Sequence, residues 1–255
     1  MRLLLELAFK GTNYHGWQIQ PGAVTIQSTI QEKIKILTHC DIDLVGCGRT
    51  DTGVHAKMYF AHFDIPESEK KLPDVKSLNA ILPPDLVIKE IYVAPEDFHA
   101  RFDATSRKYI YKIHFNKDPF DCGDSFYFKE TASLSLDKLE ECGKIILGMN
   151  DFSSFVKSNS GLTEFPCEIF ESHWLVKEDG SLEYHITANR FVRGMVRLIV
   201  GMCVNYALNK ISLDQIHEDI TNKKQITKSW SIAAEGLSLV EIKYPVEKME
   251  SWKRL

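Results

Sequence analysis

The sequence predicts an α+β protein in which helices pack on a largely antiparallel sheet. Segments that alternate between apolar and polar residues, as half-buried strands do, are separated by segments with helical periodicity. A turn signal, Asp179-Gly180, joins two of the expected strands as a hairpin. Strand and helix signals restart after about residue 100 without a detectable internal repeat, so we expect two subdomains spanning residues 1–97 and 98–255.

The first subdomain is expected to begin with a strand at Arg2–Phe9, because alternate residues there are apolar (Leu3, Leu5, Leu7 and Phe9). A helix follows Thr25, a suitable N-cap residue, and its apolar side carries Ile26, Ile30, Ile34 and Leu37. Two further strands are expected at Asp43–Gly48 and Lys57–Ile65. The loop between these two strands contains Asp51.

The clearest strand of the second subdomain is Thr105–Phe115. It places Arg107, Tyr109 and Tyr111 on one face, and Lys108, Ile110 and Lys112 on the other. The remaining elements are predicted, in chain order, as a helix at Leu136–Leu147, a hairpin of Trp174–Val176 with Leu182–Ala188, an apolar helix at Phe191–Leu208, a shorter helix at Leu213–Ile220 and a closing strand at Glu241–Val246.

The composition indicates an ordinary globular protein. Of 255 residues, 44% are hydrophobic and 26% are charged, which excludes disorder or a collagen-like repeat as the main state. The longest apolar stretch, Met195–Leu208, is interrupted by Arg197 and Asn205 and is too short to span a bilayer. Glu6 interrupts the apolar start Met1–Leu5 and no small-residue cleavage site follows, so we expect neither a targeting segment nor a membrane partner.

Charge, cysteine and histidine patterns narrow the function further. The formal net charge of −4 disfavours coating of nucleic acid by net charge but is compatible with a local basic groove. The 6 cysteines form no C-x-x-C pair, which suits a reducing cytoplasm. The 9 histidines form neither H-x-x-x-H nor H-E-x-x-H, and no Walker loop or G-x-G-x-x-G occurs, so we expect neither a metal nor a nucleotide cofactor.

Asp51 is the first candidate for chemistry. Arg49 before it is a cation able to keep a carboxylate ionised, and Gly53 after it allows a close turn. The competing interpretation is a turn aspartate that bonds its own backbone. An aspartic protease would need a second Asp-Thr-Gly or Asp-Ser-Gly, which is absent, and the residues before Asp51 are polar where a buried catalytic strand would be apolar.

Two basic segments are candidates for RNA contact. Residues 98–112 interleave cations with aromatic residues, a pattern that suits phosphates and unpaired bases, although tyrosines of a half-exposed strand can equally pack in the core. Arg190, Arg193 and Arg197 are spaced to form a stripe on the predicted apolar helix. Arg197 stands among apolar residues and needs an anion, which is either a structural partner or a catalytic carboxylate.

Six sequence boxes follow one another in a recognisable order. Residues 48–56 read G-R-T-D-T-G-V-H-A and residues 11–18 read G-T-N-Y-H-G-W-Q. The other boxes are residues 98–111, 151–155, 191–201 and 234–237. Together they cover nearly the whole chain and resemble the boxes of the TruA-type tRNA pseudouridine synthases.

The resemblance implies roles for four residues. Asp51 stands at the family's catalytic aspartate, and Tyr109 at the tyrosine that stacks on the target uracil. Arg197 stands at the arginine that pairs with the catalytic carboxylate, and Arg49 at an arginine that helps to hold the nucleotide out of the stack. The implied fold has two similar α/β subdomains that form one continuous sheet, with the active-site cleft between them.

The implied activity is an isomerisation without a cofactor, in which uridines at positions 38–40 of the tRNA anticodon stem-loop become pseudouridines. The implied partner is the tRNA anticodon arm, bound in the cytoplasm by a homodimer with a basic cleft. Asp51 is expected to be the catalytic nucleophile, with abstraction of a proton from the sugar as the alternative route. Tyr109 is a candidate for the base that removes the C5 proton.

The chain departs from the family pattern in three places. Phe9-Lys10-Gly11 stands where relatives read Y-D-G, and Arg193-Gly194 where many have two histidines. Residues 156–171 contain Lys157 as their only cation, where relatives commonly have several. These differences leave open a relative that modifies another uridine or RNA. A non-catalytic RNA-binding protein is the other alternative, which the joint presence of Asp51, Tyr109 and Arg197 disfavours.

Overall fold

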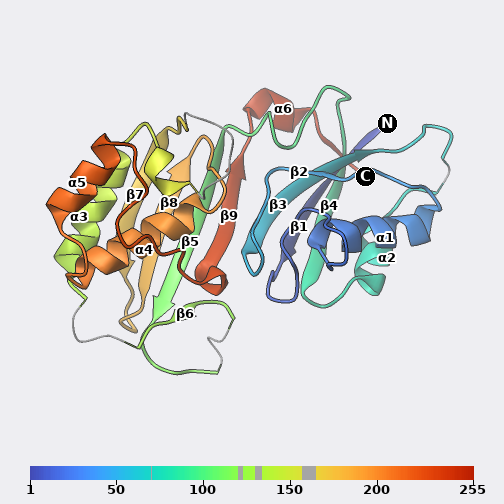
Figure 1. Cartoon of the computed structure of the whole chain (residues 1–255). Coiled ribbons are helices and arrows are strands. Elements are labelled where there is room, and N and C mark those ends of the chain that lie inside the picture. Colours follow the sequence, from blue (N-terminus) through green and yellow to red (C-terminus); the bar gives the residue numbers. More distant parts are fainter. Residues whose placement is uncertain (70, 120–122, 130–133, 157–164) are drawn as a thin grey trace. The chain divides into compact units, whose positions relative to one another are not determined.

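The computed structural model describes residues 1–255 except 70, 120–122, 130–133 and 157–164 (Figure 1). The described residues form six α-helices and a large, mostly antiparallel sheet, which confirms the predicted α+β class. They divide into two compact units, Met1–Ser106 with Leu239–Leu255, and Arg107–Ser238. The sequence placed the division after residue 97, whereas in the structure the last 17 residues pack with the first unit. No helix among the described residues is long and apolar enough to cross a membrane.

The first unit is built around strand β1, which is paired on both sides. Its neighbours are antiparallel strands β3 and β4, and Leu3, Leu5 and Leu7 of β1 are fully buried. The strand order is β10-β4-β1-β3-β9, with the short strand β2 beside β3. The bounds are β1 (Arg2–Phe9), β2 (Val45–Gly46), β3 (His55–Asp64), β4 (Leu86–Ala94), β9 (Leu237–Lys243) and β10 (Lys253–Arg254).

Helix α1 of the first unit begins where the sequence predicts. Thr25 caps it by accepting a hydrogen bond from the Ser28 amide at 3.2 Å, and the Ser28 hydroxyl accepts one from the Thr25 amide. The fully buried Ile26, Ile30 and Ile34 attach α1 to the core. The helices of this unit are α1 (Ile26–Thr38), α2 (Val75–Ile81) and α6 (Val246–Glu250). Neither α2 nor β4 was predicted from the sequence.

The second unit contains strands β5, β8 and β7 in antiparallel order, with short β6 parallel to β5. Figure 1 shows helices α3, α4 and α5 on the same side of these strands. The predicted hairpin is confirmed, and Gly180 takes the φ of +80° that its turn needs. The bounds are β5 (Ser106–His114), β6 (Phe126–Tyr127), β7 (Ile169–Val176), β8 (Leu182–Ala188), α3 (Leu136–Leu147), α4 (Met195–Ala207) and α5 (Leu213–Thr221).

The predicted start of the apolar helix at Phe191 is wrong. Helix α4 begins at Met195, because Gly194 before it has φ +76°, a left-handed conformation that does not continue a helix. Arg190 and Arg193 are exposed residues of the preceding loop and do not form a helical stripe with Arg197. The Gly194 that departs from the family pattern therefore has a structural use, which is to turn the chain into α4.

His62 on β3 is a buried titratable group of the first unit. Its side chain is 4% exposed, and its Nδ1 accepts a hydrogen bond from the Ala100 amide at 3.2 Å. Its ring lies 4.8 Å from that of His99. Burial, followed by the nearby charge of Arg2, lowers the pKa of His62 to about 4. The folded protein therefore holds this imidazole neutral and uses it as an acceptor.

We expect the free energy of unfolding to fall as the pH drops from about 6.5, the pKa of an unfolded histidine, to about 4, because only the unfolded chain binds the proton in that range. His62→Gln, which keeps an acceptor but does not titrate, should reduce this slope. Urea denaturation at several pH values measures it. His217→Gln, at an exposed position on α5, is the control, and an equal slope in the wild type and His62→Gln would contradict the assignment.

Candidate functional site

Asp51 lies in the loop between β2 and β3, and its side chain is half-buried. The Asp51 carbonyl accepts a hydrogen bond from the Val54 amide at 3.2 Å, which closes a turn around the residue. Gly53 within this turn has φ +81°, a conformation that residues with a Cβ rarely adopt. Arg49, two residues before Asp51, is exposed. The hydrogen-bonded turn thus holds the backbone of this loop, and Arg49 exposes a cation to solvent from the same loop.

The loop formed by residues 10–17 packs directly on the Asp51 loop. Gly16 has φ +80°, and a Cβ there would lie only 2.4 Å from the carbonyl oxygen of Thr50. The amide of Trp17 donates to the same oxygen at 3.3 Å. A side chain at position 16 would separate the two backbones. Two of the recognised sequence boxes therefore form one structural unit.

A second glycine fixes the other side of the Asp51 turn. A Cβ at Gly11 would lie 2.0 Å from the carbonyl oxygen of Val54. The amide of Gly11 donates to Nδ1 of buried His55 at 3.0 Å. His55 is thus a buried acceptor that holds the 10–17 loop. Asp51 is thus bracketed by backbone contacts at Thr50 and Val54.

An aromatic pair supports the chain before Asp51. Trp17 stacks on Tyr59 with ring centroids 4.2 Å apart, and both side chains are buried. The Tyr59 hydroxyl donates a hydrogen bond to the carbonyl of Gly48. Gly46 lies against both side chains, and a Cβ there would overlap the Tyr59 hydroxyl and the Trp17 ring. The aromatic residues of the 10–17 box and of β3 therefore fix the residues that lead into the catalytic candidate.

Asp85 anchors the 10–17 loop and was not identified from the sequence. Its carboxylate accepts hydrogen bonds from the Tyr14 hydroxyl at 2.6 Å and from the Asn13 amide at 2.9 Å. Burial and this carboxylate both raise the pKa of Tyr14, so the hydroxyl stays a donor. The main-chain carbonyl of Asp85 also accepts from the Lys10 amide at 2.8 Å. Asp85 lies 71 residues after Tyr14 in the chain, so no local sequence pattern indicates that the two residues interact.

Tyr109 and Tyr111 of β5 differ in what they contact. Tyr111 is fully buried and its hydroxyl donates to the Ala233 carbonyl at 2.8 Å. Tyr111 is therefore a core residue, as the alternative interpretation of the tyrosines on this strand predicted. Tyr109 is half-buried, and the ring of Phe191 meets it edge to face at a centroid distance of 5.1 Å. The two rings are thus nearly perpendicular, and Tyr109 remains partly open to solvent.

Arg197 lies on the first turn of α4 and is half-buried. Its Nε donates to the carbonyl of Ile232 at 2.6 Å, and the Ile232 amide donates back to the Arg197 carbonyl at 3.4 Å. One turn along the helix, Gly201 admits the same loop, since a Cβ there would lie 1.8 Å from the Trp230 carbonyl oxygen. The loop at residues 230–232 thus fixes the direction of the guanidinium.

The comparison with known proteins decides the family. The sequence model of a family described as tRNA pseudouridine synthase matches residues 7–103 and 144–245. A protein named tRNA pseudouridine synthase A from Azobacteroides pseudotrichonymphae is 38% identical over 244 residues, covering 96% of this chain and 97% of that protein. Proteins of the same name from Parabacteroides distasonis and Bacteroides fragilis are 35% and 34% identical, each covering at least 96% of both chains. The chain belongs to the tRNA pseudouridine synthase family.

Membership of the tRNA pseudouridine synthase family makes the protein an isomerase. In the first unit, the family boxes at residues 11–18 and 48–56 form two loops that pack on each other around Asp51. Arg49 lies on the same loop as Asp51. In the second unit, Tyr109 and Arg197 lie on elements of regular structure, β5 and α4. A solved structure, of the archaeal box H/ACA sRNP Nop10–Cbf5 complex, aligns at 9% identity and a TM-score of 0.30 over 78% of this chain and 42% of that chain, which is too low to establish a shared fold.

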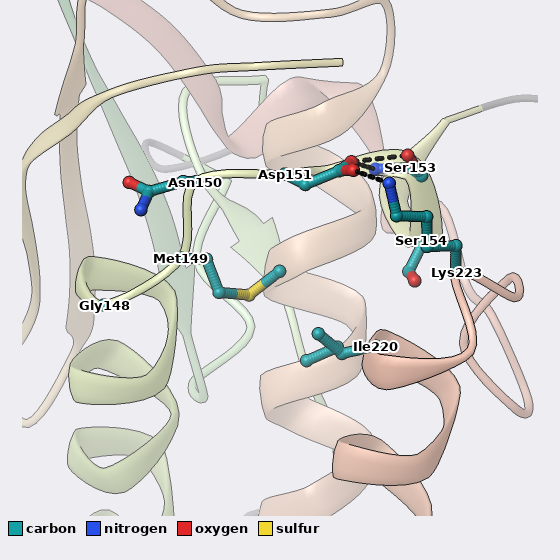
Figure 2. Close-up of a pocket in the computed structure, with 8 residues that line it drawn as sticks. All are labelled: Gly148, Met149, Asn150, Asp151, Ser153, Ser154, Ile220 and Lys223. Carbon is teal, nitrogen blue, oxygen red and sulfur yellow. Dashed lines mark hydrogen bonds and ion pairs between the residues drawn. The ribbon is translucent and has the colours of Figure 1, made fainter. Parts of the chain in front are cut away.

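The synthase box at residues 151–155 forms the wall of a separate pocket of about 250 Å³ in the second unit. Figure 2 shows the ammonium of Lys223 turned toward Asp151, at 2.7 Å from its carboxylate. Burial raises the pKa of Asp151, but hydrogen bonds from Lys223 and Ser153 outweigh burial and lower it overall. Asp151 thus ties this box to the residues after α5, and none of the four predicted site residues lines the pocket. Lys157 of the atypical segment lies outside the described residues.

We expect Gly16→Ala to destabilise the synthase more than Gly22→Ala does. Both glycines have positive φ, +80° and +73°, so each substitution carries a backbone strain of about 1–2 kcal/mol. A Cβ at Gly22 would meet nothing within 4 Å, whereas at Gly16 it would meet the Thr50 carbonyl. Urea denaturation measures the difference. Hydrogen exchange of the amides at residues 50–54 should become faster only in Gly16→Ala, and equal exchange in both variants would contradict the proposed support of the Asp51 loop.

Proposed function

We propose that this isomerase converts uridine to pseudouridine in tRNA, at positions 38–40 of the anticodon stem-loop. The relatives named tRNA pseudouridine synthase A, which match over almost their whole length, support tRNA as the substrate. The observation that carries the catalytic assignment is the double contact of Gly11 and Gly16 with the Asp51 loop. A loop held in this way can present one carboxylate in a fixed position, as catalysis requires.

The reaction exchanges one glycosidic bond for another. The N1–C1′ bond of uridine breaks, a C5–C1′ bond forms, the C5 proton leaves and N1 gains a proton, so atoms balance without a redox cofactor or a nucleotide. We assign Asp51 as the nucleophile that attacks C1′ when the uracil departs. The alternative route, in which Asp51 removes a proton from the sugar, uses the same carboxylate. In both routes Asp51 acts ionised, and a guanidinium such as that of Arg197 favours the ionised form.

Tyr109 and Arg49 are proposed to hold the target nucleotide outside the RNA stack. Removal of a base from its stack costs a few kcal/mol, which contacts with the protein have to supply. The half-buried Tyr109 ring, which packs nearly perpendicular to Phe191, is proposed as the flat surface for the uracil. Arg49 is exposed beside Asp51, where a cation would meet the phosphates on either side of the nucleotide.

We further propose that the protein acts in the cytoplasm as a homodimer whose local basic groove binds the anticodon arm. The net charge of −4 makes a local groove, and not the overall charge, the means of attracting RNA. A protein that only binds RNA would not need a carboxylate fixed by two glycine contacts. An enzyme for another uridine would keep the same site and differ in which RNA it accepts.

We expect Asp51→Asn to lower pseudouridine formation by on the order of 10⁴-fold, because the amide keeps the shape of the side chain but is not a nucleophile or a base. Tritium release from tRNA labelled at uridine C5 measures the reaction. Asp43→Asn, at an exposed position of the same segment, is the matched control and should keep full activity. Wild-type-like release by Asp51→Asn would exclude the catalytic assignment.

The target position is tested in the same assay. Release should disappear when uridines 38–40 of the labelled tRNA are replaced by cytidines, and should persist when uridines elsewhere are replaced. Tritium release from the tRNA that lacks uridines 38–40 would mean that the protein is an isomerase acting on another uridine.

Variants of Tyr109 separate stacking from proton transfer. Loss of a stacking surface costs about 1–3 kcal/mol per base, so Tyr109→Ala should lose about 5- to 150-fold in kcat/KM. If the ring alone matters, Tyr109→Phe keeps most of the activity, measured in single-turnover experiments. A loss in Tyr109→Phe as large as in Tyr109→Ala would instead assign the hydroxyl to removal of the C5 proton.

A further inference from the structure

Two histidines face each other across neighbouring strands of the second unit. His173 on β7 is the direct register partner of His185 on β8, and their rings stack with centroids 5.1 Å apart and an interplanar angle of 19°. Glu171 lies two residues before His173 and therefore on the same face of β7. All three side chains are half-buried. The cluster is thus accessible to a small solute from solvent.

This cluster lies on the sheet face opposite to Tyr109. Tyr109 of β5 pairs with Ile186 of β8, and the next pair along the two strands is Ile110 with His185. Because successive side chains of a strand point to opposite faces, His185 points to the face opposite to Tyr109. On the Tyr109 side, Tyr184, Ile186 and Trp174 are buried beneath the helices of this unit. The histidine cluster therefore does not belong to the residues assigned to isomerisation.

The three side chains offer the donor set of a transition-metal site. One ligand atom from each of Glu171, His173 and His185 lies within 4.8 Å of the other two, and no other such group of three occurs among the residues that the structure describes. Two imidazole nitrogens and one carboxylate oxygen are typical ligands of zinc. The fourth position would remain for water.

The surroundings of His185 support this interpretation. Glu183 lies 2.9 Å from Nε2 of His185, so that nitrogen is held by a carboxylate and Nδ1 is left as the ligand atom. Carboxylates in this outer position orient metal-binding histidines and increase their basicity.

Lys108 is the competitor for the same carboxylate. Its ammonium lies 2.8 Å from Oε2 of Glu171, which also accepts from the Thr187 hydroxyl at 2.6 Å. A metal ion that binds Glu171 has to displace this ammonium or share the carboxylate with it. Removal of the Lys108 charge should therefore strengthen metal binding, because it frees the Glu171 carboxylate and removes a positive charge beside the ion.

We propose that Glu171, His173 and His185 bind a zinc ion or a similar transition-metal ion on the open face of β7 and β8. The ion would link the two strands of the hairpin, and so stabilise the edge of the second unit. This site is additional to the isomerase and does not depend on the tRNA assignment.

The first test is titration of the full-length protein with Zn²⁺ in a calorimeter. Absorption of added Co²⁺ in the visible range reports on the number and geometry of its ligands. One ion should bind per chain, and His173→Ala and His185→Ala should each weaken binding by at least ten-fold. His217→Ala, at an exposed position on α5, should bind as the wild type does. Equal binding by all four proteins, or no binding by the wild type, would overturn the proposal.

Two further variants distinguish a built site from a casual pair of histidines. Glu183→Gln should weaken Zn²⁺ binding by about 10- to 100-fold, because it removes the outer carboxylate. Lys108→Met should tighten it. Zn²⁺ should also raise the melting temperature of the wild type and not of His173→Ala. If neither Glu183→Gln nor Lys108→Met changes the affinity, the ion is bound without Glu171 and the proposed donor set is wrong.

Discussion

The approach of Gly16 to the Thr50 carbonyl is the contact on which the Asp51 loop depends. Two backbones can come this close only where one of them has no side chain. With Gly11 against Val54, the contact holds both ends of the Asp51 turn through the main chain. Asp85 and the pair of Trp17 and Tyr59 then hold the supporting loop itself. The position of the Asp51 main chain therefore follows from backbone packing.

The second unit positions its candidate residues by other means. Tyr109 projects from an interior strand and Arg197 from the first turn of a buried helix, so regular structure places both. The carbonyl of Ile232 orients the guanidinium of Arg197 without cancelling its charge, which suits an arginine proposed to act on an anion. Gly201 makes this possible, because it lets the 230–232 loop reach the helix. Sites built on such elements hold their geometry better than sites on long loops.

Local patterns predicted the elements, and distant contacts determined what the sequence missed. Alternation of apolar residues predicted strand β1, and the N-cap residue Thr25 predicted the start of helix α1. The helix at Leu136–Leu147 was predicted with its observed bounds. Periodicity extended α4 too far toward its N-terminus, because the left-handed Gly194 does not alter an apolar pattern. The recognised boxes named Asp51 and its neighbours, yet they carry no sign that Asp85 anchors them, since that partner lies far along the chain.

The histidine cluster shows why spacing rules designed for helices overlook some sites. Metal motifs such as H-x-x-x-H place both ligands one helical turn apart, and no pair here has that spacing. In a hairpin, residues equally far from the turn face each other. A two-residue turn at Asp179-Gly180 would pair His173 with Ile186, whereas the observed three-residue loop, Glu178-Asp179-Gly180, pairs His173 with His185. The sequence therefore predicted the hairpin, and the length of its loop determined the register that makes the two histidines neighbours.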